Sequence, residues 1–262
     1  MASKSFRSII EKISFAKSSP ATVFADFCTL CACAFAAGTR EEEYLEVIRP
    51  YSKEELNLLS QAMALLIQEM EEKPFTDILG PYYIEVASHS SKQARGEFYT
   101  PPELSKAMVK MIVDSKQTIE KGRPITVSDP CCGSGGMVLA LAEEFAPTSV
   151  DLLRVTCQDI NPVATNMCFI NTTLWGIPAH VVQGDSLRMT VDRTWKNVHW
   201  MRVGEDTRQA IQKIDHILAR GEQEAAPEDA NHTEIQSSSS DSTAHIEQIE
   251  FNLAIDGGSK SR

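Results

Sequence analysis

Residues 1–92 carry hydrophobic positions at helical spacing along their whole length. The spacing is clearest in Lys53–Glu72, where apolar residues recur three and four positions apart and form one stripe. The same criterion predicts five helices: Phe6–Lys17, Ala21–Ala37, Arg40–Ile48, Lys53–Glu72 and Phe75–Ala87. Because such a stripe is typical of a helix that packs on its neighbours, we expect an N-terminal helical domain.

From Pro124 onward, short β-branched runs alternate with helical segments. The pattern predicts three strands: Ile125–Ser128, Leu153–Gln158 and Ala179–Gln183. A helix over Gly136–Ala146 separates the first two, and a second begins after Asn161, which can cap it, with Pro162 at its first position and Gly176 just past its end. Three such units in close succession predict a right-handed parallel sheet.

The segment between these regions carries helix-start signals. A polar linker, 88–96, is followed by Glu97-Phe-Tyr-Thr-Pro-Pro-Glu103. Thr100 is the predicted N-cap, Pro101 the first helical residue and Glu103 the reciprocal partner of a capping box. This helix is expected to run to about Thr118.

The regular alternation fades after Leu187. Residues 188–203 interleave basic and aromatic side chains: Arg188, Arg193, Trp195, Lys196, Trp200 and Arg202. Cations with stacking rings suit unpaired bases, so the segment could contact DNA. Alternatively, both tryptophans cover the exposed edge of a short sheet. The next stretch, Thr207–Arg220, predicts one amphipathic helix.

Charge is concentrated at the C-terminal end. The net charge is −11; residues 221–262 hold nine acidic and two basic residues, and the first 220 hold 27 acidic and 23 basic. The negative total therefore does not exclude nucleic-acid contacts elsewhere. Low hydrophobicity predicts disorder for 221–262, within which 246–255 could dock as a strand or helix. We expect a helical domain (1–92), a ligand-binding domain (93–220) and this acidic tail.

Seven cysteines include a C-x2-C-x-C cluster, Cys28, Cys31 and Cys33. It invites a metal interpretation, but it lies in an apolar helical pattern without a second Cys or His pair nearby. We therefore expect these thiols in the core, and no metal. No apolar run is long enough to span a bilayer, and no signal-peptide pattern follows Met1, so we expect a cytoplasmic protein without membrane contact.

An acidic residue follows each predicted strand: Asp129, Asp159 and Asp185. Ligands of parallel α/β sheets lie across these carboxyl ends. Gly133-Ser-Gly135-Gly136 adds a glycine-rich turn that lets a ligand approach the backbone. Asp159 suits ribose hydroxyls, Asp185 an exocyclic amine and Asp129 an ammonium group, and S-adenosylmethionine carries all three. The glycine spacing differs from the nicotinamide-dinucleotide fingerprint.

Four features between Phe75 and Leu187 resemble the N6-adenine DNA methyltransferases of the modification-subunit type found in type I restriction–modification systems. They are Asp77-Ile-Leu-Gly-Pro-Tyr-Tyr83, Gly96-Glu-Phe-Tyr-Thr-Pro101, the loop Asp129-Pro-Cys-Cys-Gly-Ser-Gly135, and the pair Asp159-Ile-Asn-Pro162 and Gly184-Asp185-Ser-Leu187. The glycine loop follows the Gly96–Pro101 segment by about thirty residues, which is the order of these motifs in the family.

The resemblance implies an α/β fold: a shortened Rossmann-like class I methyltransferase sheet preceded by a helical domain. It implies adenine-specific DNA methylation with S-adenosylmethionine as cofactor, DNA as substrate and a specificity subunit as partner. The cofactor-binding residues it implies are Glu97, Phe98, Tyr99, Thr100, Pro101, Asp129, Pro130, Gly133, Ser134, Gly135, Asp159, Ile160, Asp185 and Ser186.

One family feature does not occur in the 262 residues. The family holds the flipped adenine with N-P-P-[FY] or D-P-P-[FY], and Asn161-Pro162 is followed here by Val163. The catalytic residues therefore stay unassigned. Two hypotheses follow: a divergent methyltransferase, or a catalytically silent relative that binds S-adenosylmethionine and acts by partner binding, in regulation or anti-restriction.

Overall fold

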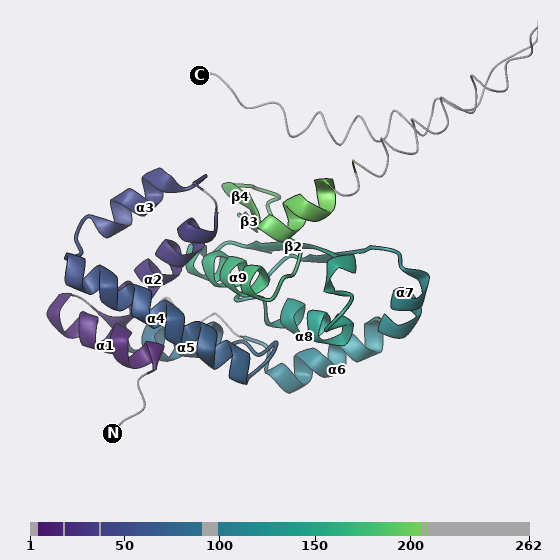
Figure 1. The fold of residues 1–262 in the computed structure, drawn as a ribbon, viewed down its shortest axis with the longest axis horizontal. Coiled ribbons are helices and arrows are strands. Elements are labelled where there is room, and N and C mark those ends of the chain that lie inside the picture. The colour runs from purple at the N-terminus through teal and green to yellow at the C-terminus, as the bar shows by residue number, and fades with distance from the viewer. Residues whose placement is uncertain (1–4, 18, 37, 91–98, 206–207, 209–262) are drawn as a thin grey trace, which may run out of the picture. The chain divides into compact units, whose positions relative to one another are not determined.

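The computed structural model describes residues 5–17, 19–36, 38–90, 99–205 and 208. Met1–Gln212 belong to one compact unit (Figure 1). The second unit, residues 213–262, lies outside the described residues. The acidic tail and 246–255 fall there, and nearly all of the amphipathic helix expected over Thr207–Arg220 also lies outside the described residues. These expectations stay predictions, as does the domain division at residue 92.

Among the described residues, the N-terminal part forms five helices: α1 (Phe6–Lys17), α2 (Pro20–Phe35), α3 (Glu41–Ile48), α4 (Lys53–Glu72) and α5 (Leu79–Ser90). The predicted bounds of α1 and α4 are confirmed, and α4 starts with a capping box between Ser52 and Glu55. The start predicted for α5 is wrong. Phe75 has a positive φ of 52°, which interrupts the helix, and the Asp77 carboxylate accepts a hydrogen bond from the Gly80 N–H at the new start.

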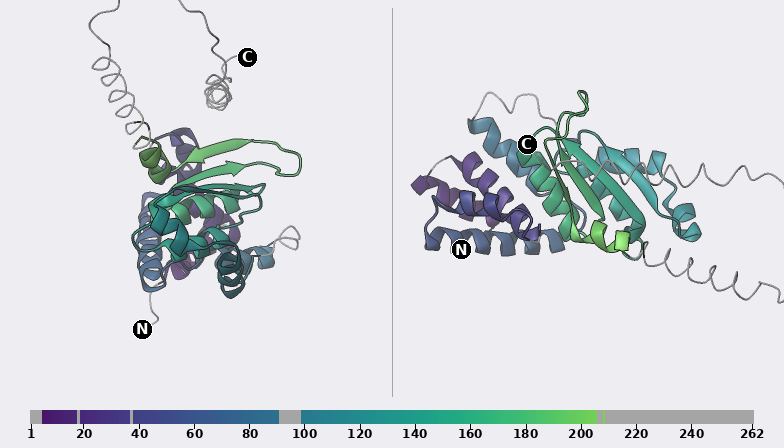
Figure 2. Two further views of the ribbon diagram at one scale, coloured as in Figure 1. Left: turned by 90° about the vertical axis from the view of Figure 1, so that its right-hand side faces the viewer. Right: turned by 90° about the horizontal axis from the view of Figure 1, so that it is seen from above.

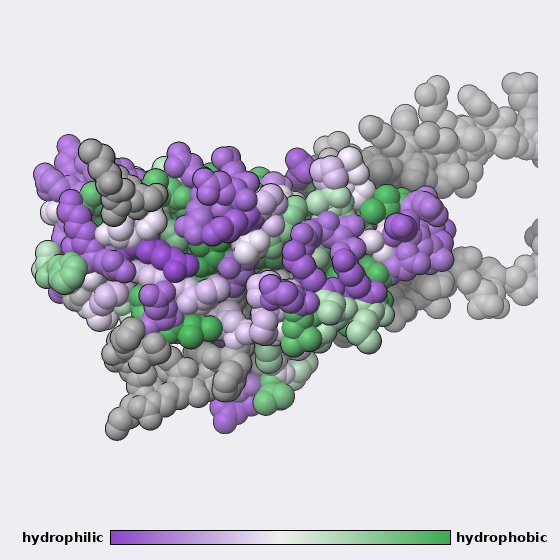
Figure 3. Space-filling view, turned by 90° about the horizontal axis from the view of Figure 1, so that it is seen from below, coloured by the Kyte–Doolittle hydropathy of each residue, from purple (hydrophilic) through white to green (hydrophobic). Residues whose placement is uncertain are grey.

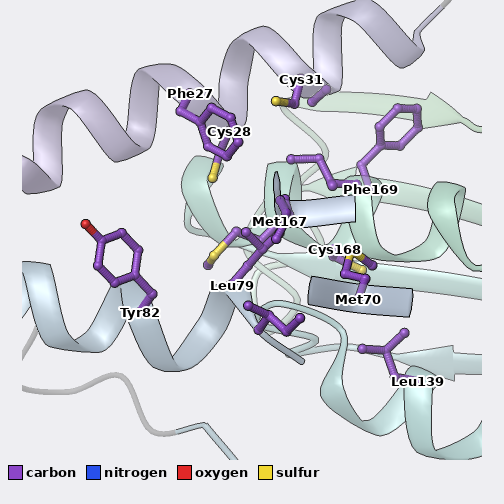
Figure 4. Close-up of a cluster of buried hydrophobic side chains, with 14 of the residues drawn as sticks. Phe27, Cys28, Cys31, Met70, Leu79, Tyr82, Leu139, Met167, Cys168 and Phe169 are labelled. Carbon is purple, nitrogen blue, oxygen red and sulfur yellow. The ribbon is translucent and has the colours of Figure 1, made fainter. Parts of the chain in front are cut away.

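The core of the unit is shared by the N-terminal helices and the sheet region. Figure 4 shows side chains of α2, α5, α8 (Gly136–Phe145) and α9 (Pro162–Leu174) converging on one cluster. Cys28 and Cys31 of α2 lie in this cluster, and Cys33 is buried as well, as expected for core thiols. Helix α2 packs directly on α9, so the two regions share one hydrophobic interior.

The single helix predicted from Pro101 to Thr118 is two helices, α6 (Pro102–Ile112) and α7 (Ser115–Lys121). The predicted capping box is wrong: Pro101 is the N-cap, with ψ 142°, and no side chain caps the helix. The residue before a proline is kept out of the α region, so Pro101 stays extended and the helix starts at Pro102. The break falls where Asp114 caps α7 by accepting from the Gln117 N–H.

In the part of the chain that the structure describes, the sheet has four strands in the order β1 (Ile125–Asp129), β2 (Leu153–Asp159), β3 (Ala179–Gln183), β4 (Arg193–Lys196). The first three are parallel, as predicted, with Asp129 beside Cys157 and Asp159 beside Gln183. Strand β4 was not predicted; it pairs antiparallel with β3. The expected α/β architecture, a short sheet with three parallel strands that follows a helical region in the chain, is confirmed.

Helix α9 packs against β2 and β3, and α8 contacts α9 (Figure 2). The predicted ends of α9 are confirmed: Asn161 is the N-cap, Pro162 the first residue, and Gly176 has a φ of 69° just past the end. Leu153, Val155 and Cys157 of β2 are buried, whereas the residues between them are partly exposed. This alternation is typical of a sheet that is packed mainly on one face.

Strand β4 covers the outer edge of β3. Trp195 is half-buried there, and the Arg40 guanidinium lies 4.3 Å from the centre of its ring. Trp200, in a helical stretch over 198–205, has its ring 5.6 Å from that of His180. The edge-covering interpretation of the two tryptophans fits these contacts, and DNA contact by 188–203 stays a prediction.

The surface seen in Figure 3 is largely hydrophilic, with hydrophobic residues in smaller groups. Within the described residues, no single helix has the length and apolar character needed to cross a membrane. The bent pair α1 and α2 meets that test only when the two are combined. Phe24 and Phe27 of α2 are fully buried in the protein core, which accounts for the apolar character of this helix.

Candidate functional site

The glycine-rich loop between β1 and α8 (residues 130–135) has a backbone that most side chains could not adopt. Gly133 has a φ of 54° and Gly135 a φ of 91°, both in the left-handed region. The Gly135 N–H donates to the Cys132 carbonyl at 2.8 Å, which closes the turn. The Cys132 N–H donates to the Gln158 carbonyl at 2.9 Å, which ties the loop to β2.

Asp159, the last residue of β2, joins this loop to the start of α9. Its Oδ2 accepts from the Gly133 N–H at 2.9 Å, and its Oδ1 accepts from the Asn161 N–H at 2.9 Å. Each carboxylate oxygen has two lone pairs, so both oxygens keep capacity for a further donor. The predicted ligand residue therefore also fixes the geometry of the loop.

Asp129, the last residue of β1, lies beside the same loop. Its carboxylate accepts from the Cys131 N–H at 3.3 Å. Burial raises the pKa of Asp129; the Cys131 N–H lowers it, and nearby Cys157 and Asp159 raise it further. A cationic ligand group would oppose this shift, since an opposite charge favours the ionised carboxylate.

Asp185 closes the turn that follows β3. Its Oδ1 accepts from the backbone N–H groups of Leu187 and Arg188 at 2.9 and 3.1 Å. The next residue, Ser186, has its Oγ 3.8 Å from the Cys131 Sγ of the glycine loop. The ends of the first and third strands thus meet at one edge, as the parallel topology predicts.

A cavity of about 940 Å³ opens beside this edge, lined by β1, the glycine loop, α6, α7 and α8. Five of the predicted cofactor-binding residues line it: Tyr99, Thr100, Asp129, Pro130 and Gly133. The aromatic ring of Tyr99 lies next to Gly133, because a Cβ added to that glycine would come within 3.1 Å of Tyr99 Cε1. A ligand of cofactor size fits such a volume.

The other predicted cofactor-binding residues that the structure describes do not line this cavity. Ser134 is fully buried and hydrogen-bonds to Asp77, and Gly135 packs against Cys168. Pro101 caps α6, and the Ile160 side chain is 63% exposed beside the carboxyl end of β2. Glu97 and Phe98 lie outside the described residues.

Sequence reasoning did not assign Asp77 and Asn171 to this site, yet both contact its loop. The Ser134 Oγ–H donates to Asp77 at 2.5 Å, and the Asn171 side chain donates to the Ser134 carbonyl at 2.9 Å. Asp77 lies in a motif recognised in the sequence, but nothing local indicated its partner 57 residues away. Within the described ranges, no group of three or more His, Cys, Asp or Glu side chains could hold a metal ion.

Comparisons with known proteins point to one family. The sequence profile of the N-6 DNA Methylase family matches residues 75–222, which is more than half of the chain. The chain is 26% identical over 122 residues to the methylase subunit of the type I restriction enzyme MpnII of Mycoplasma pneumoniae. It is 26% identical over 121 residues to that of the type I restriction enzyme MjaIX of Methanocaldococcus jannaschii.

These alignments are partial. Each covers 44% of this chain, but only 22% and 20% of the two relatives, so the chain matches about a fifth of their length. Among solved structures, it is similar to the methyltransferase subunit of a type I restriction-modification system from Streptococcus thermophilus. There the TM-score is 0.33 at 19% identity, with 70% of this chain and 39% of that chain covered.

Proposed function

Because this chain belongs to the N-6 DNA methylase family, we propose that it binds S-adenosylmethionine and takes part in methylating the N6 amine of adenine in DNA. The observation that carries the proposal is the edge at which β1, β2 and β3 end. There the Asp159 carboxylate accepts a hydrogen bond from a glycine loop with positive φ, and Asp129 and Gly133 line a cavity.

The residues at this edge match the cofactor's polar groups. Asp129 would pair with the ammonium group of the methionine part, which would offset the burial of its carboxylate. Asp159 would accept from the ribose hydroxyls through its remaining lone pairs. Asp185 would accept from the adenine amine, and the segment Glu97–Pro101 would contact the methionine part. The bound cofactor would supply an electrophilic methyl group.

The glycines support this assignment sterically. A side chain at Gly133 would need a strained backbone and would approach Tyr99 at 3.1 Å. The loop therefore offers backbone N–H groups without side-chain bulk between them and a ligand. Ile160, with its exposed apolar side chain, would cover one face of the adenine ring.

DNA and a specificity subunit are the proposed partners. The two curated relatives are named as methylase subunits of type I restriction enzymes. Base-edge readout needs a sizeable surface in a groove, which a specificity subunit would supply. The exposed, basic stretch from Arg188 to Arg202 is the proposed contact of this chain with DNA.

Transfer of labelled methyl groups to plasmid DNA tests the proposed function. Purified protein is incubated with methyl-labelled S-adenosylmethionine and plasmid, and the labelled base is identified after hydrolysis. Label on adenine N6, lost in Asp159→Ala, supports the proposal. Cofactor binding without transfer would instead favour the silent relative that acts through a partner, and label on another base would refute adenine specificity.

A further inference from the structure

The carboxylate of Asp77, just before α5, connects the glycine loop to the helical region. Its Oδ2 accepts from the Ser134 Oγ–H at 2.5 Å. Its Oδ1 accepts from the Gly80 N–H at 3.0 Å and from the Asn171 side-chain amide at 3.2 Å. The same amide donates to the Ser134 carbonyl at 2.9 Å, so loop, α5 and α9 meet at this carboxylate.

The contacts of the Asp77 carboxylate are all with hydrogen-bond donors. A carboxylate only accepts hydrogen bonds, and Gly80, Ser134 and Asn171 each donate one to it. A hydroxyl-to-oxygen distance of 2.5 Å is in the range of charge-assisted hydrogen bonds. Ser134 is fully buried and Asn171 is nearly so, which makes the loss of their acceptor costly.

The segment that carries Tyr99 packs against the same group of residues. A Cβ added to Gly80 would meet the Asp77 carboxylate, would lie 2.6 Å from Ser134 Oγ and would lie 2.9 Å from the Tyr99 ring. A Cβ on Gly133 would approach Cε1 of the same ring at 3.1 Å. Tyr99 therefore lies close to two glycines, Gly80 of α5 and Gly133 of the loop, and it lines the cavity.

We propose that Asp77 is a positioning residue for cofactor binding: its carboxylate fixes the glycine loop and Tyr99 relative to the helical region. This inference rests on the proposed function, because the ligand it serves is S-adenosylmethionine. Since Asp77 lines the cavity next to Tyr99, loss of its carboxylate loosens one wall of the ligand site. Cofactor binding and docking of α5 on the loop are then coupled, and each strengthens the other.

Asp77→Ala removes the carboxylate, and Asp26→Ala is its matched control. Asp26, on α2, is also a partly buried carboxylate whose pKa burial raises, and it accepts from the Tyr51 hydroxyl at 2.6 Å. It does not line the cavity. If Asp77 had only a structural role, the two variants would change cofactor affinity and loop protection alike. If Asp77 positions the loop, only Asp77→Ala would change them.

Two measurements are made on each full-length protein, at a temperature where all variants are folded. Calorimetric titration gives the affinity for S-adenosylmethionine, and hydrogen exchange gives the protection of the peptide that spans 131–136. We expect Asp77→Ala to weaken binding about tenfold or more and to speed loop exchange by a similar factor. Asp26→Ala should leave both unchanged while lowering the melting temperature.

A conservative variant and a double-mutant cycle complete the test. Asp77→Asn keeps an acceptor for the Gly80 N–H and should show an intermediate loss. Ser134→Ala should weaken binding by itself, and adding Asp77→Ala should then cost less than in the wild type. Additive effects would overturn the coupling between the two residues.

The outcomes separate this inference from the proposed function. Wild-type protein that binds no S-adenosylmethionine refutes the proposed function, and with it the cofactor-positioning role of Asp77. Faster loop exchange in Asp77→Ala would then show only that Asp77 fixes the loop. Wild-type binding together with equal binding by Asp77→Ala overturns the inference alone. So does loop exchange that changes no more in Asp77→Ala than in Asp26→Ala.

Discussion

Replacing Arg40 with alanine tests whether the helical region and the edge of the sheet form one stabilised unit. Arg40 is 5% exposed, and its guanidinium bonds both oxygens of Glu43, at 2.9 and 3.0 Å. It also donates to Asn166 of α9 at 2.9 Å and stacks on Trp195 of β4. One side chain thus connects the start of α3 with α9 and β4.

The magnitude follows from these contacts. Removing one partner of a buried ion pair costs about 3–5 kcal/mol, because the other charge is left uncompensated. Glu43 keeps 26% exposure and a second cation, Arg193, at 3.2 Å, so the low end of that range applies. Loss of the cation–π contact adds about 1 kcal/mol. We expect Arg40→Ala to lower the free energy of unfolding by about 3–4 kcal/mol.

Urea unfolding followed by tryptophan fluorescence measures this change. The midpoint should fall without a change in slope, which would indicate lost stability rather than an altered unfolded state. Arg40→Lys is the control: it keeps the charge but loses the two-pronged geometry, and should lose about half as much. A loss below about 1 kcal/mol in Arg40→Ala would refute the reasoning that this contact unites the two regions.

Three further predictions address the loop, its buried acid and its exposed thiol. Gly135→Ala should destabilise the protein by about 1–3 kcal/mol in urea unfolding, because Gly135 has a positive φ and its added Cβ would press on Cys168. Gly136→Ala is the control and should not destabilise it, since its Cβ would meet open space; equal effects would contradict this. Burial raises the pKa of Asp77, so the native state holds a proton at higher pH than the unfolded chain and stability falls as pH rises from 3.8 through the raised pKa. Asp77→Asn should therefore flatten this part of the stability–pH curve, and an unchanged slope would count against it. Among seven free cysteines Cys131 alone is exposed, so native protein should show one fast-reacting thiol, slowed by S-adenosylmethionine; several fast thiols would contradict the packing.

Local signals predicted much of the fold. The stripe of α4, the capping residues of α9 and the β-branched runs of β1 to β3 each carry their own periodicity or cap, and the elements formed where expected. The acids at the three strand ends could be brought together from topology alone, because parallel strands end at the same edge.

Features that depend on partners distant in sequence were not predictable in this way. Strand β4 is four residues long, mostly polar and largely exposed, and it is a strand because β3 offers an open edge. The contact of Asp77 with Ser134 likewise needs the docked helical region. At the start of α6, the Pro101-Pro102 pair overrode a capping pattern that Thr100 and Glu103 otherwise favoured.

Calorimetric titration of the wild-type protein with S-adenosylmethionine, beside Asp129→Ala and the exposed control Asp151→Ala, tests the central claim most directly. The account predicts one saturable site in the wild type and in Asp151→Ala, weakened about tenfold or more in Asp129→Ala because an ammonium group loses its counter-charge. Absence of binding by the wild type, or equal affinity in Asp129→Ala, would contradict a cofactor site at the edge where β1, β2 and β3 end.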